Sequence, residues 1–162
     1  MKFALLLVFL YEYFLWYHIS INHMYFEPWK FDFENTQYNA NIKHIIAVDF
    51  DNTIAYTKYP KIISEVPYAV DVLRVLSEDP RFVLILWTCR EGDMLKEALG
   101  FCNIRGVHFD YVNENDKERI KLYENDCRKI GADMYIDDKS AQTNVEKLWY
   151  DWYRWMKGEG II

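Results

Sequence analysis

The chain has 162 residues, a length typical of one domain, which excludes two large catalytic domains. Hydrophobic residues make up 51% of it, with only 6 glycines and 4 prolines, so it can bury a core and is not low-complexity. A net charge of -6 argues against an extended nucleic-acid surface. Three cysteines at unrelated spacings, with no CxxC pair, indicate reduced thiols in a cytoplasmic domain rather than disulfides or a zinc site.

Residues 1–23 form the most apolar segment of the chain. Residues 3–21 approach the roughly 20 residues that a helix needs to cross a bilayer, although Glu12 interrupts the run. One interpretation is a membrane anchor that tethers a cytoplasmic domain. The alternatives are a start upstream of a natural beginning at Met24, and a packed helix or signal peptide.

Residues 24–43 show no sustained period of 2 or 3.6 and end in a polar, asparagine-rich run. This pattern is typical of a linker. Regular periodicity begins at His44, and every candidate catalytic residue lies beyond that position. We therefore assign the catalytic domain to residues 44–162 and expect it to fold and act without the leader.

Apolar strands and amphipathic helices alternate through this domain. The run HIIAVDF reads as a strand buried on both faces, as in parallel sheets. Ser64 is expected to cap the first helix and Gly131 to end the third. The alternation predicts an α/β fold, a three-layer α/β/α sandwich with a central parallel sheet and right-handed crossovers. The predicted strands are 44–50, 81–88, 107–113 and 132–137, and the predicted helices are 66–79, 92–104, 116–130 and a last one from residue 143.

Polar side chains follow the predicted strands at their carboxyl ends, where such folds bind ligands. The strands end in Asp49 and Asp51, in Thr88 and Arg90, and in Asp137 and Asp138. Four carboxylates converge there without a cluster of histidines or cysteines. An oxygen-only site of this charge favours Mg²⁺ over zinc, because the carboxylates would otherwise repel one another.

These segments resemble the motifs of the haloacid dehalogenase superfamily of phosphatases and phosphotransferases. The resemblance spans residues 44 to about 142 and points to a small branch with very little cap. Asn52 departs from the glycine that is commoner at its position, which we expect to change only the turn. DFDNT (49–53) after HIIAV resembles the first motif, Thr88 after VLILW the second, a basic residue before the last strand the third, and Asp137-Asp138 after MYI the fourth.

The resemblance implies a role for each catalytic residue. Asp49 is the expected nucleophile, forming an aspartyl-phosphate, and Asp51 the expected general acid and base. Thr88 is expected to hold a phosphoryl oxygen, and Lys129 to neutralise the transferred group. Lys117 and Lys139 are rivals for the lysine role.

The resemblance also implies the metal ligands. Mg²⁺ is expected to bind Asp49, the backbone carbonyl of Asp51, and one or both of Asp137 and Asp138. Arg90 has two possible roles, a contact with the substrate phosphate or a surface salt bridge. Asn113, at the end of the third strand, is interpreted as an ordinary turn residue, with a supporting contact beside the site as the alternative.

The expected function is a Mg²⁺-dependent phosphoric monoester hydrolase that acts through an aspartyl-phosphate. A phosphotransferase can use the same intermediate. A receiver-like regulatory module also combines acidic residues, Thr and Lys, but its acidic pair follows the first strand, whereas here the pair comes last. Without a large cap, the open site predicts either a small phosphorylated molecule or an exposed phosphate of a macromolecule as substrate.

Overall fold

The computed structural model describes residues 43–141 and 144–162. The apolar segment 1–23 and the linker up to residue 42 lie outside the described residues, so the hypotheses about them stay predictions. Within the described ranges, no helix has both the length and the apolar character needed to span a bilayer.

Four parallel strands form the central sheet, in the order β5-β4-β1-β6. The predicted α/β fold with a central parallel sheet is confirmed. β4 is the second predicted strand, while β5 and β6 are shorter than the sequence indicated. The strands are β1 (His44–Val48), β4 (Phe82–Leu86), β5 (Tyr111–Val112) and β6 (Met134–Ile136).

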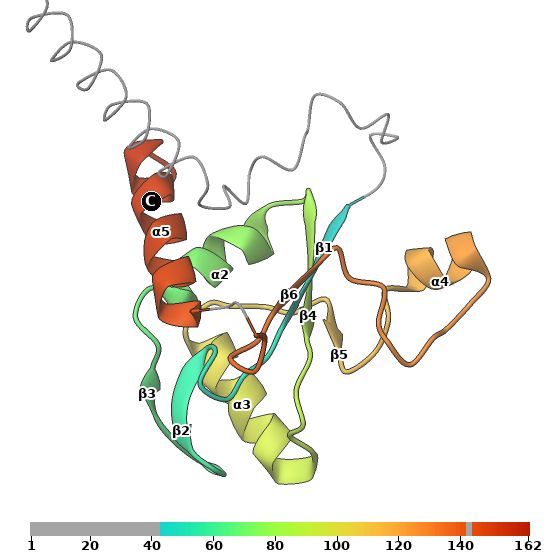
Figure 1. Cartoon of the computed structure of the whole chain (residues 1–162), viewed down its shortest axis with the longest axis horizontal. Coiled ribbons are helices and arrows are strands. Elements are labelled where there is room, and N and C mark those ends of the chain that lie inside the picture. The colour runs from blue at the N-terminus through green and yellow to red at the C-terminus, as the bar shows by residue number, and fades with distance from the viewer. Residues whose placement is uncertain (1–42, 142–143) are drawn as a thin grey trace, which may run out of the picture. The chain divides into compact units, whose positions relative to one another are not determined.

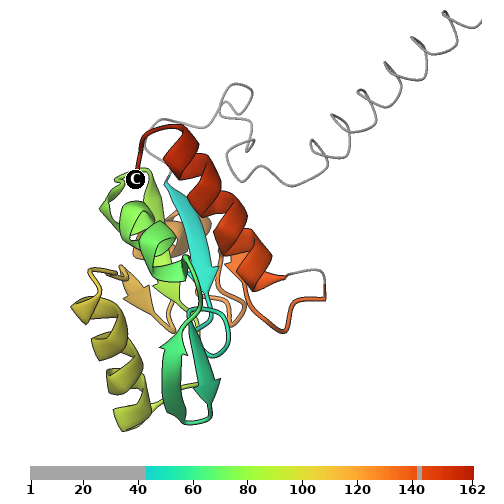
Figure 2. The same cartoon turned by 90° about the vertical axis from the view of Figure 1, so that its left-hand side faces the viewer.

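The helices cover both faces of this sheet, as Figures 1 and 2 show. α2, α3 and α5 lie on one face and α4 on the other. Right-handed crossovers explain the division: the chain moves outward from β1 through β4 to β5, then reverses to reach β6. The helices are α2 (Ala69–Glu78), α3 (Gly92–Ile104), α4 (Lys117–Tyr123) and α5 (Val145–Gly158).

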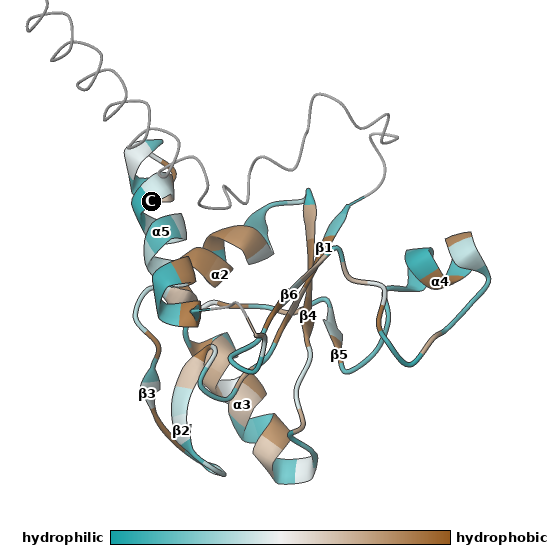
Figure 3. Cartoon of the chain, viewed as in Figure 1, coloured by the Kyte–Doolittle hydropathy of each residue, from teal (hydrophilic) through white to brown (hydrophobic). Residues whose placement is uncertain are grey.

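Successive residues of the central strands alternate between the two faces, and both faces are apolar, which is why these strands read as continuous apolar runs. β4 and α2 are accordingly hydrophobic over most of their length in Figure 3. α5 packs beside α2 and contributes its buried Trp149, Trp152 and Met156 to the core. On the α4 side the core cluster comprises Ile45, Ala47, Val83, Ile85 and Ile130.

An antiparallel hairpin that we did not predict follows the first strand. It consists of β2 (Ala55–Lys58) and β3 (Lys61–Glu65), with a cis peptide between Tyr59 and Pro60 at its tip. The expected cap of α2 by Ser64 is wrong, because Ser64 belongs to β3. Tyr68, in a left-handed conformation and without a side-chain cap, precedes the helix instead.

α4 ends at Tyr123, so the predicted helix up to residue 130 is too long. Glu124 adopts a left-handed conformation, with a φ of 51°, which stops the helix. The buried Asn115 side chain then holds the following loop in a non-helical course. It donates to the Asp126 carboxylate and the Cys127 carbonyl, and it accepts from the Gly131 amide. Lys129 therefore lies in a loop rather than near a helix end.

Candidate active site

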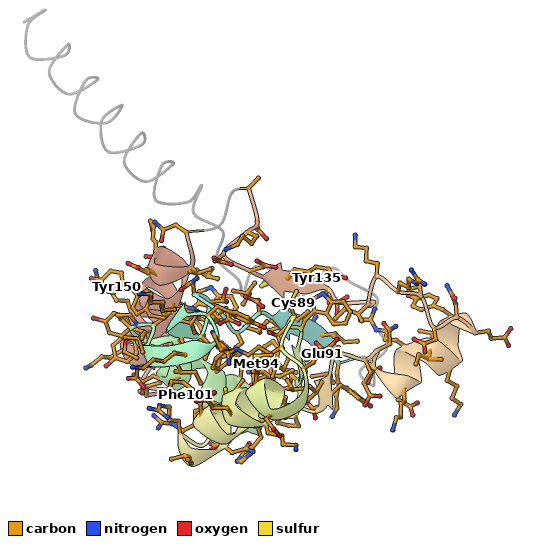
Figure 4. The ribbon with its side chains drawn as sticks, turned by 90° about the horizontal axis from the view of Figure 1, so that it is seen from below. Cys89, Glu91, Met94, Phe101, Tyr135 and Tyr150 are labelled. Carbon is orange, nitrogen blue, oxygen red and sulfur yellow. The ribbon has the colours of Figure 1, made fainter. Side chains whose placement is uncertain are left out.

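The carboxyl ends of the parallel strands meet at one edge of the sheet, and Figure 4 views the molecule from that side. The backbone hydrogen bonds between neighbouring strands continue one residue past the ends of the strands. The amide of Asp49 donates to the Ile136 carbonyl at 2.9 Å, and the amide of Trp87 donates to the Val48 carbonyl at 2.9 Å. This pairing fixes where the chain leaves β1, β4 and β6.

Three carboxylates gather at this edge, from Asp49, Asp137 and Asp138. One oxygen from each lies within 4.8 Å of the others, and all three side chains are half-buried. Burial raises the pKa of Asp49 from 3.8 to about 7, and the negative charges of the neighbouring carboxylates add to the rise against an opposing hydrogen bond from the Phe50 backbone. Three of the four carboxylates predicted to converge are thus together in the structure, while the prediction is wrong for Asp51, which is not part of this cluster.

Thr53 secures the loop that carries Asp137 and Asp138. Its side chain is fully buried, and its hydroxyl oxygen accepts a hydrogen bond from the Asp138 amide at 3.0 Å. Its carbonyl accepts a hydrogen bond from the indole Nε1 of Trp149 in α5 at 2.8 Å. The sequence placed Thr53 in the first motif but gave no sign of this bridging role.

The turn after β1 depends on Asn52. This residue has a φ of 58°, a left-handed conformation that asparagine tolerates better than most residues other than glycine. Its side-chain oxygen accepts a hydrogen bond from the Thr57 amide at 3.2 Å, a bond that glycine cannot make. Asn52 therefore fits the turn and also ties it to β2.

Asp51 lies outside the carboxylate cluster and pairs with Arg90. Nε and Nη2 of Arg90 donate to the two Asp51 oxygens at 2.9 and 2.8 Å. Although burial by itself would raise it, the pKa of Asp51 is lowered, because the hydrogen bonds and charge of Arg90 prevail. Arg90 is completely buried, so the alternative of a surface salt bridge is wrong for it.

Thr88 lies at the end of β4, the strand that pairs with β1. Its amide donates to the side-chain oxygen of Asn113 at 2.8 Å, and its hydroxyl oxygen accepts a weaker bond from the Arg90 amide at 3.3 Å. Asn113, with a φ of 54°, is a turn residue as expected. Its side chain also fixes the backbone at Thr88, in agreement with the alternative of a supporting contact beside the site.

The three candidate lysines lie in different surroundings. Lys139 donates to the Asp138 carboxylate, and this bond together with the nearby carboxylates raises the pKa of Lys139. Nζ of Lys129 lies 5.7 Å from the centre of the Tyr135 ring. Lys117 is the first residue of α4. Within the part of the chain that the structure describes, the ion pair with the carboxylate cluster is made by Lys139.

The donor set suits a hard divalent cation. It consists of carboxylate oxygens, which Mg²⁺ prefers, without nitrogen or sulfur ligands in the cluster. The pKa of Asp49 is raised mainly by burial and further by the neighbouring carboxylates, and a bound cation would favour its ionised form. Asp49, Asp137 and Asp138 therefore fit the expected Mg²⁺.

The sheet order and the position of this cluster define a Rossmann-like α/β protein with an acidic site at the carboxyl ends of its strands. The chain is similar to a solved structure of a conserved protein from Bacteroides thetaiotaomicron, with 35% sequence identity and a TM-score of 0.56. The match covers 74% of this chain and 93% of that one, so the chain belongs to the same family as the Bacteroides protein. No protein-family model and no curated protein matches it.

Proposed function

We propose that this chain is a Mg²⁺-dependent phosphoric monoester hydrolase of the haloacid dehalogenase superfamily, with Asp49 as its nucleophile. The convergence of Asp49 with Asp137 and Asp138 supports the proposal most directly. This arrangement places a nucleophilic carboxylate beside two others that can hold a cation. The motif order along the chain provides independent support from the sequence.

In the first step, an oxygen of Asp49 attacks phosphorus, and the bond between phosphorus and the leaving oxygen breaks. Water then attacks the phosphorus of the aspartyl-phosphate, which releases inorganic phosphate and regenerates Asp49. Bound Mg²⁺ supplies positive charge that offsets the negative charge of the phosphate and of the carboxylates.

Asp51 is proposed to move the proton in both steps. Both of its oxygens accept hydrogen bonds from Arg90, an arrangement that favours the ionised carboxylate. The ionised form takes the proton from the hydrolytic water in the second step. The acid role in the first step requires the protonated form, which Arg90 disfavours, so we expect substrates with good leaving groups to react fastest.

Thr88 is proposed to hold a phosphoryl oxygen by its hydroxyl, in keeping with its place beside the end of β1. A lysine completes the charge balance. Lys129 remains the candidate from the sequence, while Lys139 is supported by its contact with Asp138. Lysine-to-methionine variants at the two positions separate these assignments. Turnover should fall only when the substitution removes the charge of the lysine that acts in catalysis.

The test is hydrolysis of an aryl phosphate by the full chain in Mg²⁺, with Asp49→Asn as the diagnostic variant. Turnover should fall by at least roughly a thousandfold, as expected when a nucleophile is removed. Asp151→Asn is the matched control, because Asp151 pairs with Lys147 on α5 and is not a member of the carboxylate cluster. Retained turnover in Asp49→Asn contradicts the proposal, and release of less phosphate than leaving group indicates transfer to another acceptor.

A further inference from the structure

Arg90 is a charged side chain with none of its surface exposed. A guanidinium group carries five N–H donors, and burial is costly unless they find acceptors. Arg90 follows β4 by a short loop and precedes α3. Cys89 and Glu91, which flank it, and Met94 are labelled in Figure 4.

Two of these donors bind Asp51 in a bidentate pair, described above. Such a pair fixes the plane of the carboxylate as well as its position, since both oxygens are held at once. Asp51 therefore has one orientation relative to Asp49, two residues earlier. A single ammonium group could not impose the same geometry.

The remaining contacts of Arg90 reach the hairpin and α3. Its Nη2, which already binds Asp51, also donates to the Pro60 carbonyl at 2.8 Å, and Nη1 donates to the Met94 carbonyl at 3.4 Å. The guanidinium carbon lies 4.8 Å from the centre of the Phe50 ring and 5.6 Å from that of Tyr59. One nitrogen thus joins the tip of the β2–β3 hairpin to the Asp51 carboxylate.

We propose that Arg90 is a positioning residue that locks the tip of the β2–β3 hairpin to Asp51, making the hairpin a fixed wall of the site rather than a mobile lid. The catalytic part of this inference rests on the proposed function, because it concerns the orientation of Asp51. The mechanical part, the coupling between hairpin and carboxylate, does not. Tyr59, next to Pro60 at the tip, contacts the Arg90 guanidinium with its ring and is 58% exposed.

Arg105 offers a matched control for a test by Arg90→Lys. Arg105 follows the last residue of α3 and binds Glu65 of the hairpin at 3.2 Å. It also donates to the Phe101 carbonyl and lies over the Phe101 ring. None of these contacts is to Asp51. Arg105→Lys therefore weakens a hairpin tether of similar chemistry without touching the carboxylate.

The first measurement is amide hydrogen exchange across the hairpin, in the full chain. Arg90→Lys should speed exchange at the amides of residues 58, 59, 61 and 62 by roughly tenfold or more, as expected when a local structure opens more readily. Asp51→Asn should have the same effect, because it removes the other end of the link. Arg105→Lys should leave these amides unchanged. If amide exchange at the hairpin tip is unchanged in Asp51→Asn, the coupling is overturned. This outcome decides the question even if Arg90→Lys does not fold.

The second measurement is steady-state hydrolysis of an aryl phosphate. Arg90→Lys should lower kcat by roughly a hundredfold, the scale of a small misplacement of a reacting group, while KM stays nearly constant. The double variant Arg90→Lys/Asp51→Asn should be no slower than Asp51→Asn alone. If the loss of kcat in the double variant equals the sum of the two single losses in free energy, Arg90 does not act through Asp51, and the positioning role is overturned. A wild-type chain without any turnover contradicts the proposed function instead, and the exchange measurement still decides the coupling.

Discussion

Two carboxylates at the end of β1, only two residues apart, lie in opposite surroundings. Asp49 shares its site with Asp137 and Asp138, and burial among these like charges raises its pKa to about 7. Asp51 is paired with the buried Arg90, and its pKa is lowered. The chain turns between the two residues, because the Asp49 amide still pairs with the Ile136 carbonyl of β6, whereas the Phe50 carbonyl already accepts from the amides of the following turn.

The difference shows which region is complete without a ligand. The Arg90 network pairs its charges within the protein, so its geometry is already set. The carboxylate cluster carries a surplus of negative charge that Lys139 offsets only in part. An external cation is therefore expected to act on the cluster and to leave the Arg90 network unchanged.

The largest expected effect is that of metal removal. Exhaustive chelation should lower aryl phosphate hydrolysis by at least roughly a thousandfold, because metal ions supply several kcal/mol of charge stabilisation in such reactions. Adding back Mg²⁺ should restore the rate, which a coupled assay of phosphate release measures. Full activity after chelation would contradict the inference that the carboxylate cluster needs a cation and the Arg90 network does not.

A smaller effect is expected from Asp51→Asn, and it depends on the leaving group. Loss of a general acid costs roughly a hundredfold or more, but only where the leaving oxygen needs a proton. Alkyl phosphate hydrolysis should therefore fall further than formation of the phosphoryl-enzyme from an aryl phosphate. Rapid-quench and steady-state rates on the two substrates measure the ratio. Equal losses on both would contradict the acid role of Asp51.

Thr53→Val tests how firmly Thr53 holds the loop beside the carboxylate cluster. The variant keeps the shape of the side chain but leaves the Asp138 amide without its acceptor, which costs about 1–3 kcal/mol of unfolding free energy. Mg²⁺ affinity should weaken as well, because the loop that carries Asp137 and Asp138 loses its anchor. Urea unfolding and calorimetric titration check both effects. Ser77→Ala removes an exposed hydroxyl bond and should change neither.

A last expected effect is on stability rather than activity, and it concerns the metal-free protein. Between about pH 4 and 7, folded Asp49 holds a proton that the unfolded chain releases, so the free energy of unfolding falls as the pH rises through this window. Asp49→Asn cannot lose that proton. In chelator, its Tm should exceed that of the wild type by a margin that grows from pH 4 to pH 7. A constant margin would show that Asp49 titrates normally.

The sequence predicted those parts of the molecule that a local pattern encodes. The runs around β1 and β4 are apolar because both faces of the sheet are covered, and α3 matches its predicted bounds. Asp49, Asp137 and Asp138 could be brought together because parallel strands place their carboxyl ends at one edge. These inferences require only periodicity and the rule for crossovers.

The remaining features depend on contacts between distant residues. The hairpin escaped prediction because its strands are short and β3 is mostly exposed, so it has no clear apolar period. Arg90 could not be paired with Asp51 before the hairpin was known, since Pro60 shares the same guanidinium group. The early end of α4 reflects the side chain of Asn115, which binds residues 11 to 16 positions further along.

The hydrogen bond from Trp149 to Thr53 has a consequence for the order in which the protein is made. Thr53 belongs to the loop after β1, but the side chain that holds its carbonyl is synthesised 96 residues later, in the last helix. The Asp138 amide, its second partner, also emerges late. A ribosome-bound chain from which α5 has not yet emerged therefore has its nucleophile but an incomplete site, and activity is expected only after α5 has emerged.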